Sequence, residues 1–250
     1  HFLIGAERFM LKTPWPIITL LILAIAFAAT RSLRIVAGCL VTLMAIGYLD
    51  MWDDTMRTIS MIFVCTLLSI AIGIPIGILM ARSDRVQQVM NPILDVMQTM
   101  PSFVYLIPVV MLLGIGKVPG LIAVVIYAIP PMIRLTNLGI RLVDKDVLEA
   151  ADAFGADDRQ KLLKVQLPLA LPTIMAGINQ TIMMALAMVV IASMIGVQGL
   201  GQPVLKAIAN QYFTLGMFNG LAIVGIAIMF DRVSQAYGKR LQKHREVVHG

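Results

Sequence analysis

The residues of this chain that could do chemistry are concentrated in one polar segment, residues 144–168, between two long hydrophobic stretches. Asp146 can cap a helix there by accepting a backbone N–H of the first turn. Glu149 follows three residues later, as in a capping box. Gly155 follows the last apolar residue, where helices commonly end in a left-handed residue. The chemistry that this pattern predicts is recognition by a bent pair of helices rather than catalysis.

The surface of this element suits the docking of a partner. Ala150-Ala151 is small enough to let another surface come close, and Phe154 offers an apolar side chain on the same helix. We expect Asp157 to cap a second helix that runs to Val165. Leu167-Pro168 would end that helix, because the residue before a proline avoids the α conformation. From the helix pattern alone, an ordinary cytoplasmic loop also explains the segment.

A nucleotide site is not predicted in this chain. The best glycine–lysine pair, Gly116-Lys117, is followed by Val118, whereas a Walker A loop needs Ser or Thr there. Met111 stands where that loop has its first glycine. All three histidines lie close to the termini and offer no interior metal site. We therefore expect no enzymatic activity and no cofactor bound by this chain itself.

The composition is typical of a polytopic membrane protein. Of the 250 residues, 59% are hydrophobic and 14% charged, with a mean hydropathy of +0.87, whereas soluble domains carry about 25% charged residues. Lipid favours helices, because backbone polar groups must be hydrogen-bonded within the chain there. We predict an all-α bundle of about seven transmembrane helices. The net charge of +6 is spread over the loops, so we expect no nucleic-acid partner.

The apolar runs divide the chain into three parts. Residues 1–57 hold a short polar lead and a transmembrane hairpin, residues 58–231 a helical core, and residues 232–250 a basic cytoplasmic tail. An amphipathic cytoplasmic stretch is expected at residues 86–97. The predicted spans are residues 15–29, 35–49, 58–81, 101–113, 121–133, 172–195 and 215–230.

The third span contains the sequence Gly73-Ile-Pro75-Ile-Gly77. Glycines four residues apart let two helices approach closely. Pro75 removes a backbone donor and should kink the helix. Close packing and a hinge that moves during function are both compatible with this pattern.

The distribution of basic residues orients the chain. If residues 144–168 lie inside the cell, most of the 20 Lys and Arg residues fall in inside loops and in the tail, as the positive-inside rule requires. With seven spans, the N-terminus is then periplasmic and the C-terminus cytoplasmic.

The predicted apolar runs contain no Asp, Glu, Lys, Arg or His. Ion-driven transporters usually carry such residues inside the membrane, so proton coupling is disfavoured. A secondary transporter that binds sodium through carbonyls and hydroxyls remains the alternative, and so does a membrane anchor without transport. Packing between helices could equally explain the candidate pathway residues. These candidates are Phe103, Tyr105, Tyr127, Asn179, Gln180, Thr181 and Ser193.

Longer motifs add a family resemblance. The 144–168 segment resembles the EAA signature of ATP-binding-cassette (ABC) importer permeases. The matching pattern is Glu149-Ala150-Ala151, three residues, Gly155, nine residues, Val165, one residue and Leu167-Pro168, with Val165 in place of the usual Ile. Other segments are similar to the glycine betaine/proline branch of that family: residues 98–108, 164–170, 172–181 and 189–202.

The resemblance implies the type I ABC importer permease fold and a bacterial inner-membrane location. ATP and magnesium would bind a separate cytoplasmic ATPase dimer, and a periplasmic binding protein would deliver the solute. Two permease copies, surrounded by lipids, would form the pathway. The implied solutes are glycine betaine, proline betaine, choline, carnitine or trimethylamine oxide. The residues implied in ATPase coupling are Glu149, Ala150, Ala151, Phe154, Gly155, Leu167 and Pro168.

Overall fold

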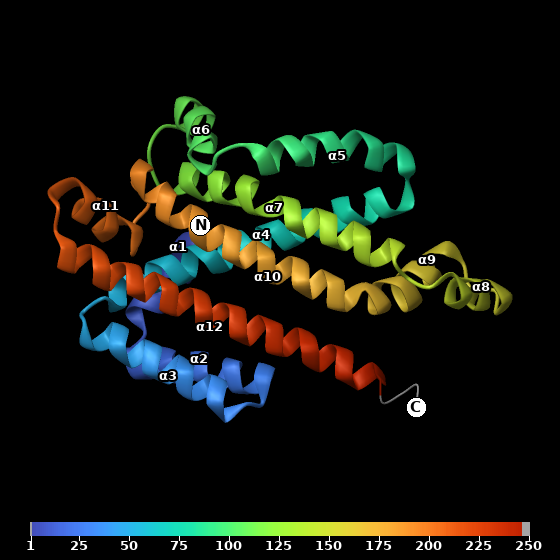
Figure 1. Cartoon of the computed structure of the whole chain (residues 1–250), viewed down its shortest axis with the longest axis horizontal. Coiled ribbons are helices and arrows are strands. Elements are labelled where there is room, and N and C mark those ends of the chain that lie inside the picture. Colours follow the sequence, from blue (N-terminus) through green and yellow to red (C-terminus); the bar gives the residue numbers. More distant parts are fainter. Residues whose placement is uncertain (1, 247–250) are drawn as a thin grey trace.

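The chain folds into an elongated bundle of helices in a computed structural model, which describes the backbone of residues 2–246 and the side-chain surroundings of residues 3–240 (Figure 1). Every regular element in this range is helical, which confirms the predicted all-α class. The α-helices are α1 (Phe2–Lys12), α2 (Trp15–Thr30), α3 (Leu33–Tyr48), α4 (Trp52–Arg82), α5 (Asp84–Thr99), α6 (Leu106–Leu113), α7 (Lys117–Arg141), α8 (Lys145–Ala153), α9 (Asp158–Gln160), α10 (Leu167–Ala192), α11 (Gly201–Asn210) and α12 (Phe213–Glu246). Short 3₁₀ turns occupy Ser102–Tyr105 and Ser193–Ile195, and a π-helix occupies Lys161–Gln166.

Four long helices, α4, α7, α10 and α12, form the body of the bundle (Figure 1). Helix α7 packs against both α4 and α10, and α10 packs against α12. The α2–α3 hairpin lies beside α12, and α5 lies along α7. Helices α8 and α9 project from one end of the bundle, whereas α6 and α11 lie at the other end. Helices α8 and α9 are therefore set apart from the packed body, whereas Leu162, later in the 144–168 segment, is buried against residues of α7 and α10.

Two glycines of α4 bring α4 and α7 into close contact. A Cβ atom added to Gly73 would lie 2.7 Å from Cγ of Met132, and one added to Gly77 would lie 2.6 Å from Cβ of Thr136. Residues four apart on α4 thus meet residues four apart on α7, so the two helices run parallel. The close approach expected from the glycine spacing is present. The hinge role of Gly73, Pro75 and Gly77 stays a prediction.

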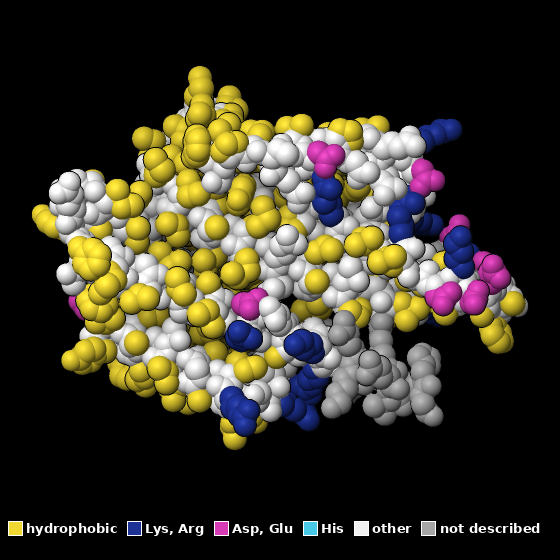
Figure 2. Space-filling model, viewed as in Figure 1, with side chains coloured by type: hydrophobic (Ala, Val, Ile, Leu, Met, Phe, Trp, Pro, Cys, Tyr) yellow, Lys and Arg dark blue, Asp and Glu magenta, His cyan; other side chains and the backbone are white. Residues whose placement is uncertain are grey.

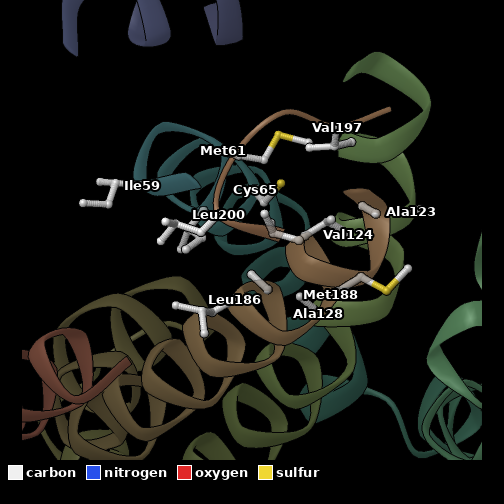
Figure 3. Close-up of a cluster of buried hydrophobic side chains, with 14 of the residues drawn as sticks. Ile59, Met61, Cys65, Ala123, Val124, Ala128, Leu186, Met188, Val197 and Leu200 are labelled. Carbon is white, nitrogen blue, oxygen red and sulfur yellow. The ribbon is translucent and has the colours of Figure 1, made fainter. Parts of the chain in front are cut away.

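The largest hydrophobic cluster joins α4, α7 and α10. Cys65, Val124 and Met188 contribute one buried side chain from each of these helices, as Figure 3 shows. Val197 and Leu200, which follow α10, close the cluster from the end of the bundle. Close packing of this kind holds membrane helices together, because lipid tails remove the usual hydrophobic drive for helix association. The three helices therefore form one packed frame.

Each of the seven predicted apolar runs forms a helix, but they differ in length. Four helical stretches in the described chain are long and apolar enough to cross a membrane by themselves, and up to six spans result if each of two bent pairs counts as one. Helix α3, with 16 residues, is shorter than these. The polytopic helical class is confirmed.

The fourth predicted span, residues 101–113, is wrong as an independent span. It consists of a 3₁₀ turn and the 8-residue helix α6, and it qualifies only together with α5, from which it bends by 110°. The amphipathic stretch at residues 86–97 is helical, as its spacing predicts, and its cytoplasmic location stays a prediction. It forms α5, because Leu94 is buried with Ile129 and Ile133 of α7 and draws the helix onto the bundle.

The expected polar lead is helix α1 in its described part, and this helix packs against α4. Leu3 and Met10 contact the main core, and a carboxylate oxygen of Glu7 lies 2.7 Å from Nζ of Lys117. The sequence analysis did not predict this helix, because its contacts with α4 and α7 join residues far apart in the sequence. At the other end of the chain, the predicted tail continues α12 to Glu246. Residues 247–250 lie outside the described range.

Candidate docking loop and aromatic pair

Helix α8 begins at a different cap from the one predicted. The N-cap is Asp144, whose carboxylate accepts the N–H of Asp146 at 3.0 Å. The prediction of Asp146 as the cap, with Glu149 completing a capping box, is wrong, because the helix starts two residues earlier. Asp146 instead lies in the first turn, where its negative charge interacts favourably with the positive end of the helix dipole.

Helix α8 ends in the left-handed turn expected at Gly155. The φ angle of Gly155 is 74°. Its N–H donates to O of Asp152 at 2.9 Å, and the N–H of Ala156 donates to O of Ala151 at 3.0 Å. This pair of bonds is the Schellman motif, which satisfies carbonyls at the helix end. A turn residue of this conformation reverses the chain tightly between α8 and α9.

The second helix is capped as predicted but does not end as predicted. Asp157 and Gln160 form a reciprocal capping box. The chain then continues through the π-helix Lys161–Gln166 into α10, with Pro168 in the first turn. In an α-helix, the ring of Pro168 would clash with the carbonyl of residue 164. The wider π-helical turns before the proline keep the helix continuous.

The α8 part of the loop is exposed, and the loop is held by ionic contacts and by the buried side chain of Leu162. No residue of α8 is buried, and the Phe154 side chain is 92% exposed. Nζ of Lys161 lies 2.5 Å from Oδ1 of Asp152, and Nη2 of Arg82 lies 4.0 Å from Oδ2 of Asp158. Figure 2 shows charged side chains gathered over α8 and α9 and a largely uncharged face on the bundle body. An exposed aromatic side chain on such a projecting loop is available for a partner.

Arg141 fixes the helix ends beside the loop. Its Nη2 donates to O of Met80 at 2.9 Å and to Oδ1 of Asp84 at 2.6 Å, and its Nε donates to Oδ1 of Asn137 at 3.1 Å. The Met80 carbonyl belongs to the last turn of α4, where carbonyls lack helical donors. Arg141 therefore ties the ends of α4, α5 and α7 together just before the loop begins.

Two of the predicted pathway residues, Tyr105 and Tyr127, meet. Their ring centroids lie 5.6 Å apart with the planes at 74°, in an edge-to-face contact. The Tyr105 hydroxyl donates to O of Met97. Phe103 lies nearby in sequence and is exposed. We refer to Tyr105 and Tyr127 as the aromatic pair.

The predicted pathway residues on α10 do not form one site. Nδ2 of Asn179 donates to Oδ1 of Asp231 on α12 at 3.1 Å, so Asn179 binds the neighbouring helix. Ser193 donates to O of Val189 within its own helix, about 20 Å along the axis from Asn179. Thr181 is fully buried, whereas Gln180 is exposed.

Helices α5, α7 and α12 carry ionisable residues that lie outside the predicted apolar runs. Arg134 lies within α7 and Asp231 within α12, because both helices continue beyond the predicted spans. Asp95 lies within α5. Ile133 and Ile140, seven residues apart, recur at helical spacing, and this sequence signal could have extended α7 past Arg134.

The comparison with known families explains the loop and the fold together. The family described as "Binding-protein-dependent transport system inner membrane component" matches residues 73–243, which include the 144–168 loop. The chain belongs to this family. It is therefore a multi-pass inner-membrane component of such a transport system, as the sequence motifs predict.

Individual relatives agree with this assignment. The chain is 48% identical over 239 residues to the glycine betaine/proline betaine transport system permease protein ProW of Escherichia coli, covering 96% of this chain and 67% of that protein. It is 48% identical to the glycine betaine/carnitine transport permease protein GbuB of Listeria monocytogenes, covering 93% of this chain and 83% of that protein. The chain thus spans about two thirds of the first of these relatives.

A solved structure shares the fold. The methionine ABC transporter MetNI, in an inward-facing conformation, matches with a TM-score of 0.66 at 20% identity. The match covers 74% of this chain and 93% of the MetNI chain. At that identity the likeness concerns the fold, and it confirms the type I ABC importer permease architecture that was expected.

Proposed function

We propose that this permease imports a zwitterionic compatible solute of the glycine betaine class and is driven by a separate ATPase that docks on the 144–168 loop. The observation that carries the docking is the loop itself: a capped helix and a left-handed turn, with no buried residue in α8 and with Phe154 fully presented. An exposed aromatic side chain is a common anchor in protein interfaces.

Support for the solute class comes from the relatives and from the aromatic pair. ProW and GbuB are both named as glycine betaine permeases. Aromatic faces attract quaternary ammonium groups, and Tyr105 and Tyr127 place two rings in contact inside the bundle. Proline betaine and carnitine carry the same cationic group and belong to the same proposal.

The proposed assembly contains two copies of this chain, an ATPase dimer that binds ATP and magnesium, and a periplasmic binding protein. The 144–168 loop and the described end of α12 lie at the same end of the bundle (Figure 1), so both would face the cytoplasm. Closure of the ATPase dimer would push the two loops together. Arg141 ties the ends of α4 and α5 to the end of α7, next to the start of the loop, and would pass a movement of α7 to α4 and α5.

The test replaces the turn residue of the loop. Gly155→Val places a β-branched side chain at a φ of 74°, which costs about 1–2 kcal/mol for an L-residue and should displace Phe154. We expect the permease to insert normally but to lose co-purification with the ATPase and solute-stimulated ATP hydrolysis.

Gly114→Val is the matched control. Gly114 also has a positive φ, 77°, and open space around its Cβ position, but it lies after α6 at the other end of the bundle (Figure 1). This variant is expected to retain ATPase binding. Normal uptake by Gly155→Val at equal membrane levels would contradict the proposed docking, as would uptake that follows an ion gradient without the ATPase.

A further inference from the structure

Arg134 and Asp95 form an ion pair between α7 and α5, part-way along both helices. Nη2 of Arg134 donates to Oδ1 of Asp95, and Figure 2 shows an acidic and a basic group in contact over α5 and α7. The Arg134 side chain is 34% exposed and that of Asp95 is 64% exposed. The pair therefore opens on the outer face of the chain.

The position of Arg134 along α7 makes free exposure to lipid costly. Helix α7 has 25 residues at about 1.5 Å per residue, little more than a hydrocarbon core of about 30 Å. If the hydrocarbon layer of the membrane begins at either end of α7, Arg134 lies within it. Charged groups at such depths face a water-filled cavity or another protein surface. This face of α5 and α7 must therefore meet a polar environment within the membrane.

Arg134 has hydrogen-bond donors that its contact with Asp95 does not use. Its Nε atom is buried and has no partner in the described part of the chain. The contact with Asp95 joins one nitrogen to one oxygen. A guanidinium group carries five N–H donors in a planar fork that matches a carboxylate. Asp95 therefore holds Arg134 without saturating it.

The same seam carries the aromatic pair. Tyr127 precedes Arg134 by seven residues, so both side chains leave α7 on the same side, about 10 Å apart along the axis. Tyr105 contacts Tyr127 and bonds to O of Met97, two residues beyond Asp95 on α5. Tyr105 is buried and Tyr127 is partly exposed, so the seam offers the Tyr127 ring, backed by Tyr105, for a cation and, further along, a guanidinium for an anion.

We propose that Arg134 releases Asp95 and binds the carboxylate of the zwitterionic solute during translocation, while Tyr127, held in place by Tyr105, contacts the quaternary ammonium group of the solute. This inference rests on the proposed function, because only a carboxylated betaine carries both charges. Asp95 competes with the solute for the guanidinium, so the solute is held weakly enough to be released. When the solute leaves, the ion pair between Arg134 and Asp95 re-forms. Arg134 is thus a specificity-determining residue.

The test uses the complete transporter in liposomes, with its ATPase, its binding protein and glycine betaine as the probe. Arg134→Gln is expected to lower betaine uptake about tenfold, which corresponds to about 1.4 kcal/mol. Arg134→Lys keeps the charge but not the planar fork and is expected to retain part of the uptake. Asp95→Asn removes the competitor and is expected to keep uptake with a lower KM.

An exchange of the two charges separates solute binding from a purely structural ion pair. The double variant Asp95→Arg/Arg134→Asp preserves the pair but moves the guanidinium to α5, and uptake is expected to stay low. Restored uptake in this variant, or normal uptake by Arg134→Gln, would overturn the inference. If Arg134→Gln does not accumulate in the membrane, Asp95→Asn decides, since loss of uptake there would also overturn it. Absence of betaine uptake by the unaltered transporter would refute the proposed function itself.

Discussion

At the scale of single residues, Gly77 sets the distance between two helices. A Cβ atom at this position would lie 2.6 Å from Cβ of Thr136 and 2.8 Å from the backbone O of Ile133. Backbone atoms cannot move aside as the end of a side chain can, so one added methyl group must push α4 and α7 apart. The glycine spacing predicted this close approach, but not its partners, because two helices in one sequence give no sign of which faces meet.

Gly77→Ala is therefore expected to destabilise the bundle by about 1–3 kcal/mol, as overpacking does in well-packed interiors. A chain of this size should then lose a few degrees of Tm. Thermal unfolding of the purified permease in detergent measures the shift. Gly220→Ala is the control, because a Cβ atom there would meet nothing within 4 Å. Equal Tm values for the two variants would contradict the packing described here.

At the scale of elements, Pro75 lies inside α4 and leaves the carbonyl of Ala71 without its helical donor. If this break is a hinge, Pro75→Ala should stiffen α4 and lower the transport rate while the protein still inserts and binds its ATPase. Uptake measured at equal membrane levels is the readout. The control is Pro92→Ala, which removes a proline from the interior of α5 and should leave uptake unchanged. Unchanged transport by Pro75→Ala would discard the hinge.

Elements were predicted well where local residues decide them and poorly where packing does. Asp157 and Gly155 act through bonds within a few residues, so their cap and turn could be read from the sequence. Leu167-Pro168 did not end the helix, because π-helical turns upstream of the proline absorb the strain. The packing of residues 86–97 against α7 was not predicted, since these contacts join residues that lie far apart in the sequence.

Sites divide in the same way. The docking loop could be proposed from a local motif, because its residues are contiguous in the sequence, and its role stays a prediction; α8 and Phe154 are exposed, whereas Leu162 is buried. The meeting of Tyr105 with Tyr127 and of Arg134 with Asp95 depends on how α5 and α6 fold back along α7. No local sequence pattern predicts which residues of α5 and α6 lie opposite which residues of α7. The candidates on α10 were chosen for polarity alone, and Asn179 proved to bind α12.

At the scale of the whole molecule, the orientation in the membrane is a prediction with a direct test. The 144–168 loop and the end of α12 share one end of the bundle (Figure 1), and most basic residues were assigned to that side, as inside loops require. A reporter active only in the cytoplasm should be active when fused to the C-terminus and inactive when fused to the N-terminus. A periplasmic C-terminus would place the loop out of reach of any ATPase.

The independence of α8 has an evolutionary consequence. The cap at Asp144 and the turn at Gly155 come from the loop's own residues, and α8 buries none of its side chains. Mutations on its outward surface therefore escape the constraints that close packing imposes on the bundle. Helix α8 can therefore diversify together with the ATPase that docks on it. Duplicated transporters in one cell can then acquire separate ATPases while keeping the same transmembrane fold.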